Sequence, residues 1–250
     1  MPLPRQVPDR VAQLTGKDTR YWAVLPAAGT GTRMGAGVPK QYLPLGSKTV
    51  IEHTLDALLA CEELSGVVVV VAVDDEHWPG IGAGYADKPL TVVTGGSERC
   101  HSVLNGLEHL AQQAHADDWV LVHDAARPCL RPADVTTLIE TLAGDAHGGL
   151  LGVPVADTMK RVDAGLQVID TVERDGLWHA LTPQMFRLAE LRAALQDVVD
   201  GSALVTDEAA AMERAGYAPR MVQGHRDNIK ITLPADLALA AFYLQARQST

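Results

Sequence analysis

Short apolar runs alternate with amphipathic segments of helical spacing from Tyr21 to Thr137. The run from Val67 to Val73 contains no polar residue, which is typical of a strand that is covered on both faces. Strands separated by connections of helical length pair in parallel, with right-handed crossovers. The sequence therefore predicts an α/β fold, with a Rossmann-like, mostly parallel sheet flanked by helices.

Ligands of such sheets bind outside the carboxyl ends of the strands, so the turns at those ends form the candidate site. Three turns qualify, at residues 26–40, 95–102 and 124–127. Each of them is rich in glycine or carries a cation. We expect the three turns to converge on one crevice.

The first of these turns runs from Pro26 to Met34 as Pro-Ala-Ala-Gly-Thr-Gly-Thr-Arg-Met and continues to Lys40. Its small residues leave backbone N–H groups open to an anion, and Arg33 and Lys40 add positive charge. It is not a Walker A loop, and Met34 stands where a dinucleotide fingerprint needs its third glycine. The alternative is a glycine-rich surface turn with two solvated cations.

The charge balance limits the partners of the chain. The 250 residues carry a formal net charge of −10 at pH 7, which argues against a nucleic-acid polymer or an anionic membrane as partner. An anionic ligand must then be met by a local group of cations. No apolar run approaches the roughly 20 residues that a membrane-spanning helix needs.

The remaining composition favours a cytoplasmic protein without a metal site of its own. The three cysteines are not in Cys-x-x-Cys spacing, which fits a reducing compartment, and there is no His-Glu-x-x-His motif. Residues 1–20 contain several prolines and mixed charges but no apolar core of a secretion signal. We expect a flexible tail over 1–20 and a single domain over 21–250.

The pattern changes after Pro154. Residues 157–162 and 166–172 read as two strands around a turn, but they are too polar for a core hairpin. We expect a β-hairpin arm at about 155–176 that projects from the domain and pairs with a second chain. Further on, Thr206 is expected to cap a helix, and residues 228–232 are expected to form the last strand.

Taken together and in order, the motifs of the chain resemble those of the 2-C-methyl-D-erythritol 4-phosphate cytidylyltransferase family, in the sugar-phosphate nucleotidyltransferase superfamily. The resemblance extends from about Tyr21 to the final helix. The matching segments are residues 26–34, 39–42, 95–99, 123–128, 157–160, 177–184, 206–209 and 227–230.

The resemblance implies that CTP and 2-C-methyl-D-erythritol 4-phosphate are joined to give the CDP-linked methylerythritol and pyrophosphate, in non-mevalonate isoprenoid precursor biosynthesis. In-line attack of the sugar phosphate on the α-phosphorus needs positioning and positive charge rather than a side-chain nucleophile. Mg²⁺ or another divalent cation is expected on the triphosphate, with no certain protein ligand.

The resemblance also implies roles for individual residues. Arg33, Lys40 and Lys230 are expected to be the catalytic cations. The expected nucleotide site consists of Pro26, Ala27, Ala28, Gly29, Gly31, Thr32, Arg33, Lys40, Gly95, Gly96, Arg99, Ser102, Asp124 and Ala125. The expected sugar-phosphate site consists of Asp124, Arg127, Thr158, Arg174, Thr182, Thr206 and Lys230. Of these, Thr158 and Arg174 would reach from the arm into the neighbouring subunit of a homodimer.

Two other functions remain open at this point. A related cytidylyltransferase for ribitol 5-phosphate or another polyol phosphate could keep the nucleotide loop, but it should differ around 124–127 and on the arm. A non-catalytic nucleotide-binding module need not keep all three cations. The sequence matches the methylerythritol type at 124–127 and on the arm.

Overall fold

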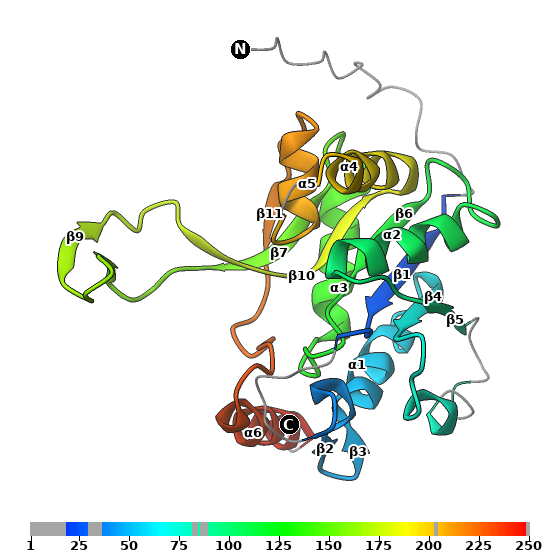
Figure 1. Cartoon of the computed structure of the whole chain (residues 1–250), viewed down its shortest axis with the longest axis horizontal. Helices are drawn as coiled ribbons and strands as arrows, with labels where there is room; N and C mark the ends of the chain where they lie inside the picture. The colour runs from blue at the N-terminus through cyan, green and yellow to red at the C-terminus, as the bar shows by residue number, and fades with distance from the viewer. Residues whose placement is uncertain (1–18, 30–36, 82–84, 86–89, 203–204, 249–250) are drawn as a thin grey trace.

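The computed structural model describes residues 19–29, 37–81, 85, 90–202 and 205–248. A seven-stranded sheet forms its centre, in the order β11-β7-β10-β6-β1-β4-β5 (Figure 1). The strands are β1 (Tyr21–Pro26), β4 (Leu64–Val71), β5 (Leu90–Thr94), β6 (Trp119–Val122), β7 (Gly149–Pro154), β10 (Trp178–Arg187) and β11 (Arg220–Gln223). Only β10 runs antiparallel to its neighbours β6 and β7, and the other pairs in this sheet are parallel. The predicted fold class, a mostly parallel sheet, is confirmed.

Consecutive residues of β1 point to opposite faces of the sheet and enter two separate cores. Ala23 and Leu25 pack into one core, whereas Trp22 and Val24 pack into the other. The strands are apolar on both faces because helices cover both faces. The apolar run predicted at 67–73 is β4, although the strand begins earlier, at Leu64, and ends at Val71.

Helices form the two outer layers. The first core receives α1 (Val50–Leu59) and α3 (Pro132–Leu142), and the second receives α2 (Arg99–Leu110), α4 (Leu188–Asp200) and α5 (Glu208–Arg214). The last helix, α6 (Pro234–Gln248), packs instead beside the short hairpin of β2 (Pro44–Leu45) and β3 (Lys48–Thr49) (Figure 1). In the described part of the chain, no helix combines the length and apolar character needed to cross a membrane.

Two local predictions from the sequence are wrong. The cap of α5 is Asp207 rather than Thr206, because the Asp207 carboxylate accepts the N–H of Ala210 at 3.0 Å. Residues 228–232 are not a strand. The N–H of Ile231 donates instead to the carbonyl of Ala126 at 2.8 Å, so this segment is bonded to the turn after β6 rather than to the edge of the sheet. That bond brings the segment to the carboxyl ends of the strands.

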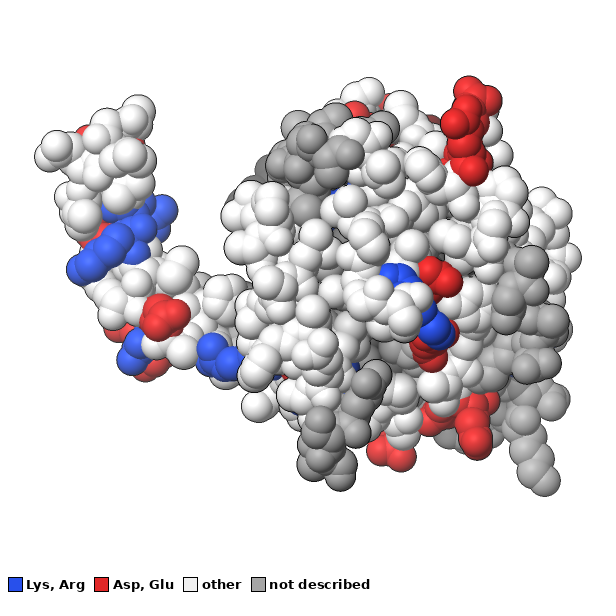
Figure 2. All heavy atoms as spheres, turned by 90° about the horizontal axis from the view of Figure 1, so that it is seen from below, with Lys and Arg blue, Asp and Glu red and all other residues white. Residues whose placement is uncertain are grey.

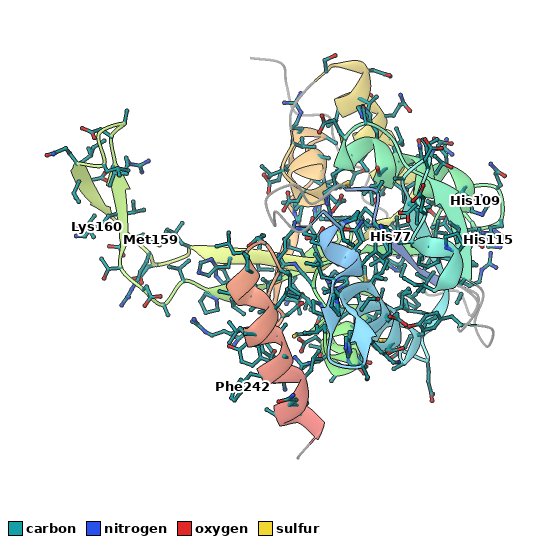
Figure 3. The ribbon with its side chains drawn as sticks, turned by 60° about the horizontal axis from the view of Figure 1, so that its bottom comes forward. His77, His109, His115, Met159, Lys160 and Phe242 are labelled. Atoms are coloured by element: carbon teal, nitrogen blue, oxygen red, sulfur yellow. The ribbon has the colours of Figure 1, made fainter. Side chains whose placement is uncertain are left out.

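Strands β8 (Met159–Val162) and β9 (Val168–Val172) pair with each other in a separate antiparallel ribbon. The ribbon stands at the end of a long extension of β7 and β10, away from the body (Figure 1), and Met159 and Lys160 lie far out on it (Figure 3). Its surface includes apolar side chains, with Leu166 81% exposed and Val168 62% exposed. The blue side chains on the visible face in Figure 2 gather mainly on this arm.

Candidate active site

A pocket of about 300 Å³ lies at the carboxyl ends of β1, β5 and β6, where the three turns meet. The sequence-predicted residues that line it are Pro26, Ala27, Ala28, Gly29, Lys40, Gly96, Arg99, Ser102, Asp124, Ala125 and Lys230. The structure therefore brings together residues from the 26–40, 95–102 and 124–127 turns and from the segment before α6. Gly31, Thr32 and Arg33 were also predicted here, but they lie outside the described residues.

The first two turns approach each other closely, and a glycine makes that possible. A Cβ atom added to Gly95 would lie 2.6 Å from Cβ of Ala28 and 2.8 Å from Oγ of Ser102. Ser102 in turn accepts the N–H of Gly96 at 3.2 Å. Gly95 itself does not line the pocket, but its missing side chain lets the two backbones form one wall.

Gln41 fixes the first residues of the 26–40 turn, from Ala27 to Gly29. Its Nε2 donates to the carbonyl of Ala27 at 2.5 Å and to the carbonyl of Gly29 at 3.0 Å. Because the side chain is buried, these bonds are shielded from water and fix the backbone course. Next to it, Nζ of Lys40 donates to the carbonyl of Ile231 at 3.0 Å, which links the turn to the segment that carries Lys230.

Asp124 is the centre of the charged part of the pocket. Its carboxylate lies 3.1 Å from Nε of Arg99, 2.9 Å from Nζ of Lys230 and 3.5 Å from Nε of Arg127. Burial alone would raise the pKa of the Asp124 carboxyl, but the three cations, first among them Arg99, outweigh burial and hold that pKa well below its ordinary value. The side chain of Asp124 is therefore an anion that can only accept hydrogen bonds.

Arg99 is held between two carboxylates. Its Nη1 and Nη2 donate to the two oxygens of Glu208 at 2.6 and 3.0 Å, and its Nε donates to Asp124. Although burial acts to lower the pKa of the guanidinium, the two carboxylates raise it, so Arg99 stays charged. Glu208 is 1% exposed, and it was not predicted from the sequence as a site residue.

A buried histidine supports Asp124 from behind. The N–H of Asp124 donates to Oγ1 of Thr182 at 3.1 Å, and that oxygen lies 2.9 Å from Nδ1 of His123. Burial lowers the pKa of His123 to about 4, so the ring is neutral at pH 7. Its Nε2, 3.3 Å from the carbonyl of Arg127, then carries the proton, and Nδ1 accepts the Thr182 hydroxyl. Thr182, predicted as a substrate contact, thus lies behind the pocket wall.

The other predicted sugar-phosphate residues are spread more widely. Arg127 is buried beside Asp124 and donates from Nη1 to the carbonyl of Asn228 at 2.8 Å. Thr206 is exposed ahead of α5 and does not line the pocket. Thr158 and Arg174 lie away from this pocket, on the arm, where both line a second depression.

Sequence reasoning missed His123, Gln41 and Glu208 as individual members of the site. His123 and Gln41 stand inside segments that had been singled out, 123–128 and 39–42, so their position beside a predicted ligand residue was a usable signal. Glu208 stands in the segment 206–209, but nothing local connects it to Arg99, which precedes it by 109 positions. Within the described residues, no group of three or more His, Cys, Asp or Glu side chains is arranged to hold a metal ion.

Curated relatives match most of this chain, and the match covers most of their own length. A protein of Pseudomonas fluorescens (strain Pf0-1), named 2-C-methyl-D-erythritol 4-phosphate cytidylyltransferase, is 54% identical over 218 residues, which are 87% of this chain and 92% of the relative. A protein of the same name from Pseudomonas aeruginosa (strain PAO1) is 53% identical over 87% of this chain and 93% of its own.

Solved structures agree. A crystal structure of 4-diphosphocytidyl-2C-methyl-D-erythritol synthase superposes with a TM-score of 0.79 at 38% identity, covering 91% of this chain and 99% of the other. The 2-C-methyl-D-erythritol 4-phosphate cytidylyltransferase of Thermus thermophilus gives a TM-score of 0.74 at 30% identity, covering 91% and 100%. The family model of this enzyme matches residues 21–246. The chain therefore belongs to the 2-C-methyl-D-erythritol 4-phosphate cytidylyltransferase family.

Proposed function

We propose that the pocket binds CTP against the two glycine turns and 2-C-methyl-D-erythritol 4-phosphate beside Asp124. The chain is a nucleotidyltransferase of isoprenoid precursor biosynthesis, and its reaction is the transfer of a cytidylyl group from CTP to the sugar phosphate. The observation that carries the proposal is that Lys40 and Lys230 line the same pocket as the bare backbone of Ala28, Gly29 and Gly96.

The glycine turns suit the cytidine and the start of the triphosphate. Ala27 to Gly29 and Gly96 carry side chains no larger than a methyl group, so a base or an anion can approach this part of the backbone closely. Arg33 belongs to the same turn and would add a further cation to the phosphates. Lys40, which enters the pocket from the end of that turn, supplies charge at the other side.

The transfer itself needs no protein nucleophile. An oxygen of the sugar phosphate attacks the α-phosphorus of CTP, the bond from that phosphorus to the bridging oxygen breaks, and pyrophosphate leaves with its electron pair. The attacking phosphate oxygen is already anionic, so no general base has to remove a proton. Lys40 and Lys230, with Arg33, stabilise the charge that collects on the five-coordinate phosphorus and on the leaving group.

A divalent cation, Mg²⁺ for example, fits this site as a partner of the triphosphate. Asp124 already faces three cations, and among the described residues of the pocket there is no set of carboxylates that would hold the ion alone. When bound, the ion would neutralise phosphate charge and orient the leaving pyrophosphate.

Asp124 is proposed to bind the hydroxyl groups of the acceptor. As an anion it accepts from hydroxyls, and Arg127, which supports it, adds positive charge near the acceptor phosphate. Lys230 carries three N–H donors, so it can keep its bond to Asp124 while it donates to the α-phosphate.

The arm is proposed to complete the pocket of a second subunit. Thr158 and Arg174 lie together on a ribbon that leads away from the body containing their own pocket (Figure 1). Exposed apolar side chains on the same ribbon, such as Val168 and Ile169, would be covered in a homodimer. Arg174 as a solvated arm residue is the alternative. The cytoplasm is the proposed location, since the three cysteines are not in Cys-x-x-Cys spacing, which fits a reducing compartment.

The test of the reaction is pyrophosphate release from CTP and Mg²⁺ with three acceptors: methylerythritol 4-phosphate, ribitol 5-phosphate, and none. Release that depends on methylerythritol 4-phosphate is expected. Release only with ribitol 5-phosphate would make that compound the acceptor instead. No release with any acceptor would favour a nucleotide-binding module without catalysis.

A further inference from the structure

We propose that Glu208 is a positioning residue for the acceptor: acting through Arg99, it orients the Asp124 carboxylate and keeps it available to the hydroxyl groups of the sugar phosphate. The inference rests on the proposed function, since it assumes that Asp124 receives those hydroxyls. Glu208 does not itself line the pocket, but it bonds to Arg99, which does.

The geometry is that of a fixed relay of charges. Both oxygens of Glu208 accept from Arg99, at 2.6 and 3.0 Å, and the third nitrogen of the same guanidinium donates to Asp124 at 3.1 Å. A guanidinium is planar and rigid, so fixing two of its nitrogens also fixes the direction of the third. Glu208, at the start of α5, thus holds Oδ1 of Asp124 in place through Arg99.

The charges point to the same role. Three cations face Asp124. Without Glu208, Arg99 would have Asp124 as its one carboxylate partner in this cluster. Glu208 shares Arg99, so the cluster has two anions for three cations. Removing the Glu208 charge makes the pocket more positive. That change favours the triphosphate, but it ties Asp124 more strongly to its own protein partners and so weakens its bonds to neutral hydroxyls.

Glu208 is itself held in place from the sheet. Gln184 on β10 donates from Nε2 to Asp207 at 2.9 Å and accepts the N–H of Ala209 at 2.8 Å, so it bonds to both neighbours of Glu208. Thr182, on the same strand, accepts the N–H of Asp124. Asp124 is therefore positioned through its backbone by β10 and through its side chain by α5, which is the support that a preorganised binding group needs.

The variant Glu208→Gln tests the proposal, because it keeps the size of the side chain and one acceptor for Arg99 but removes the charge. We expect KM for the sugar phosphate to rise about tenfold or more, as for the loss of a charged hydrogen bond, while KM for CTP does not rise. Glu213→Gln, on an exposed position of the same helix, is the matched control and should leave both values unchanged. An unchanged acceptor KM in Glu208→Gln would overturn the proposal, as would an equal rise in both KM values.

A double variant separates positioning from a general loss of structure. If Glu208 acts only through Arg99, then Arg99→Gln combined with Glu208→Gln should have the same acceptor KM as Arg99→Gln alone. Multiplying effects would contradict the relay. Assay of the wild-type enzyme in parallel distinguishes failure of the proposed function from failure of this inference. If the wild type does not turn over the sugar phosphate, the proposed function is refuted. If the wild type is active but Glu208→Gln does not raise the acceptor KM selectively, only the role of Glu208 is refuted.

Discussion

Nζ of Lys230 lies 2.9 Å from Oδ2 of Asp124, so the cation expected at the α-phosphate and the carboxylate expected at the acceptor hydroxyls are in direct contact. In the proposed mechanism, the nucleotide and the acceptor therefore meet at one ion pair. A charge at the acceptor end of the pocket affects the charge that is available at the phosphorus, and the effects of substitutions at the two residues should not be independent.

Replacement of Lys40 by Gln should lower kcat by about a hundredfold, because one preorganised positive charge is removed from the developing phosphorane and the leaving pyrophosphate. Pyrophosphate release at saturating CTP and acceptor measures this. Lys48 is a matched control, since its exposed ammonium pairs with Asp56 at 2.6 Å, and Lys48→Gln should retain the wild-type rate. Full activity of Lys40→Gln would remove Lys40 from the catalytic cations.

Replacement of Gly95 by Ala should weaken CTP binding and cost about 1–3 kcal/mol of stability, as overpacking does. The new methyl group would meet Ala28 at 2.6 Å and Ser102 at 2.8 Å, so the two turns would have to separate. Calorimetric titration with CTP and urea unfolding measure the two effects. Gly144→Ala is the control, because nothing lies within 4 Å of the added atom. If both variants bind CTP equally, the close approach of the turns is not required for the nucleotide.

The buried neutral His123 should make the protein less stable as the pH falls from 7 to 5. Burial lowers its folded-state pKa to about 4, below the ordinary value, so the unfolded chain takes up the proton first. The loss begins near the ordinary pKa of about 6.5, is complete near pH 4, and should amount to about 2 kcal/mol between pH 7 and 5.

Urea unfolding of the wild type and of His123→Gln at both pH values measures this contribution. The variant is less stable overall but should have the flatter pH dependence. His115→Gln, at an exposed residue (Figure 3), should keep the wild-type slope. An equal slope in wild type and His123→Gln would show that the histidine is not the group that titrates.

Action of the arm between subunits can be measured with mixed dimers of Arg174→Ala and Lys230→Ala subunits carrying different tags. Each parent should be nearly inactive. If Arg174 serves the neighbouring pocket, a mixed dimer contains one site with both residues intact and should regain activity. If Arg174 serves its own pocket, mixing produces no intact site and no gain over the parents. If Arg174 only faces solvent, the Arg174→Ala parent already has wild-type activity before mixing.

The sheet and the position of the pocket could be predicted because they depend on local patterns. The unbroken apolar residues of β4 and the glycines after β1 and β5 require a covered strand and open turns wherever they occur. Similarly, the polar residues at 157–172 predicted a hairpin outside the core, and β8 and β9 pair there.

The missed features depend on partners that are distant in the sequence. Residues 228–232 have the composition of a strand, but their course is set by the bond from Ile231 to Ala126 and by the pairing of Lys230 with Asp124. Likewise, an acidic residue in the first turn of a helix is favourable on dipole grounds alone, and this hides the role of Glu208 as a partner of Arg99.

Strand β10 connects the arm to the pocket. It starts at Trp178, where the chain returns from the arm, and ends at Arg187, which pairs with Trp119 at the start of β6. Between those points, Thr182 and Gln184 bond to Asp124 and to the start of α5. One continuous strand thus connects the base of the arm to the residues that support the pocket. A change at the base of the arm would therefore act on the pocket of its own subunit and, in the proposed homodimer, on the contact with the neighbouring subunit as well.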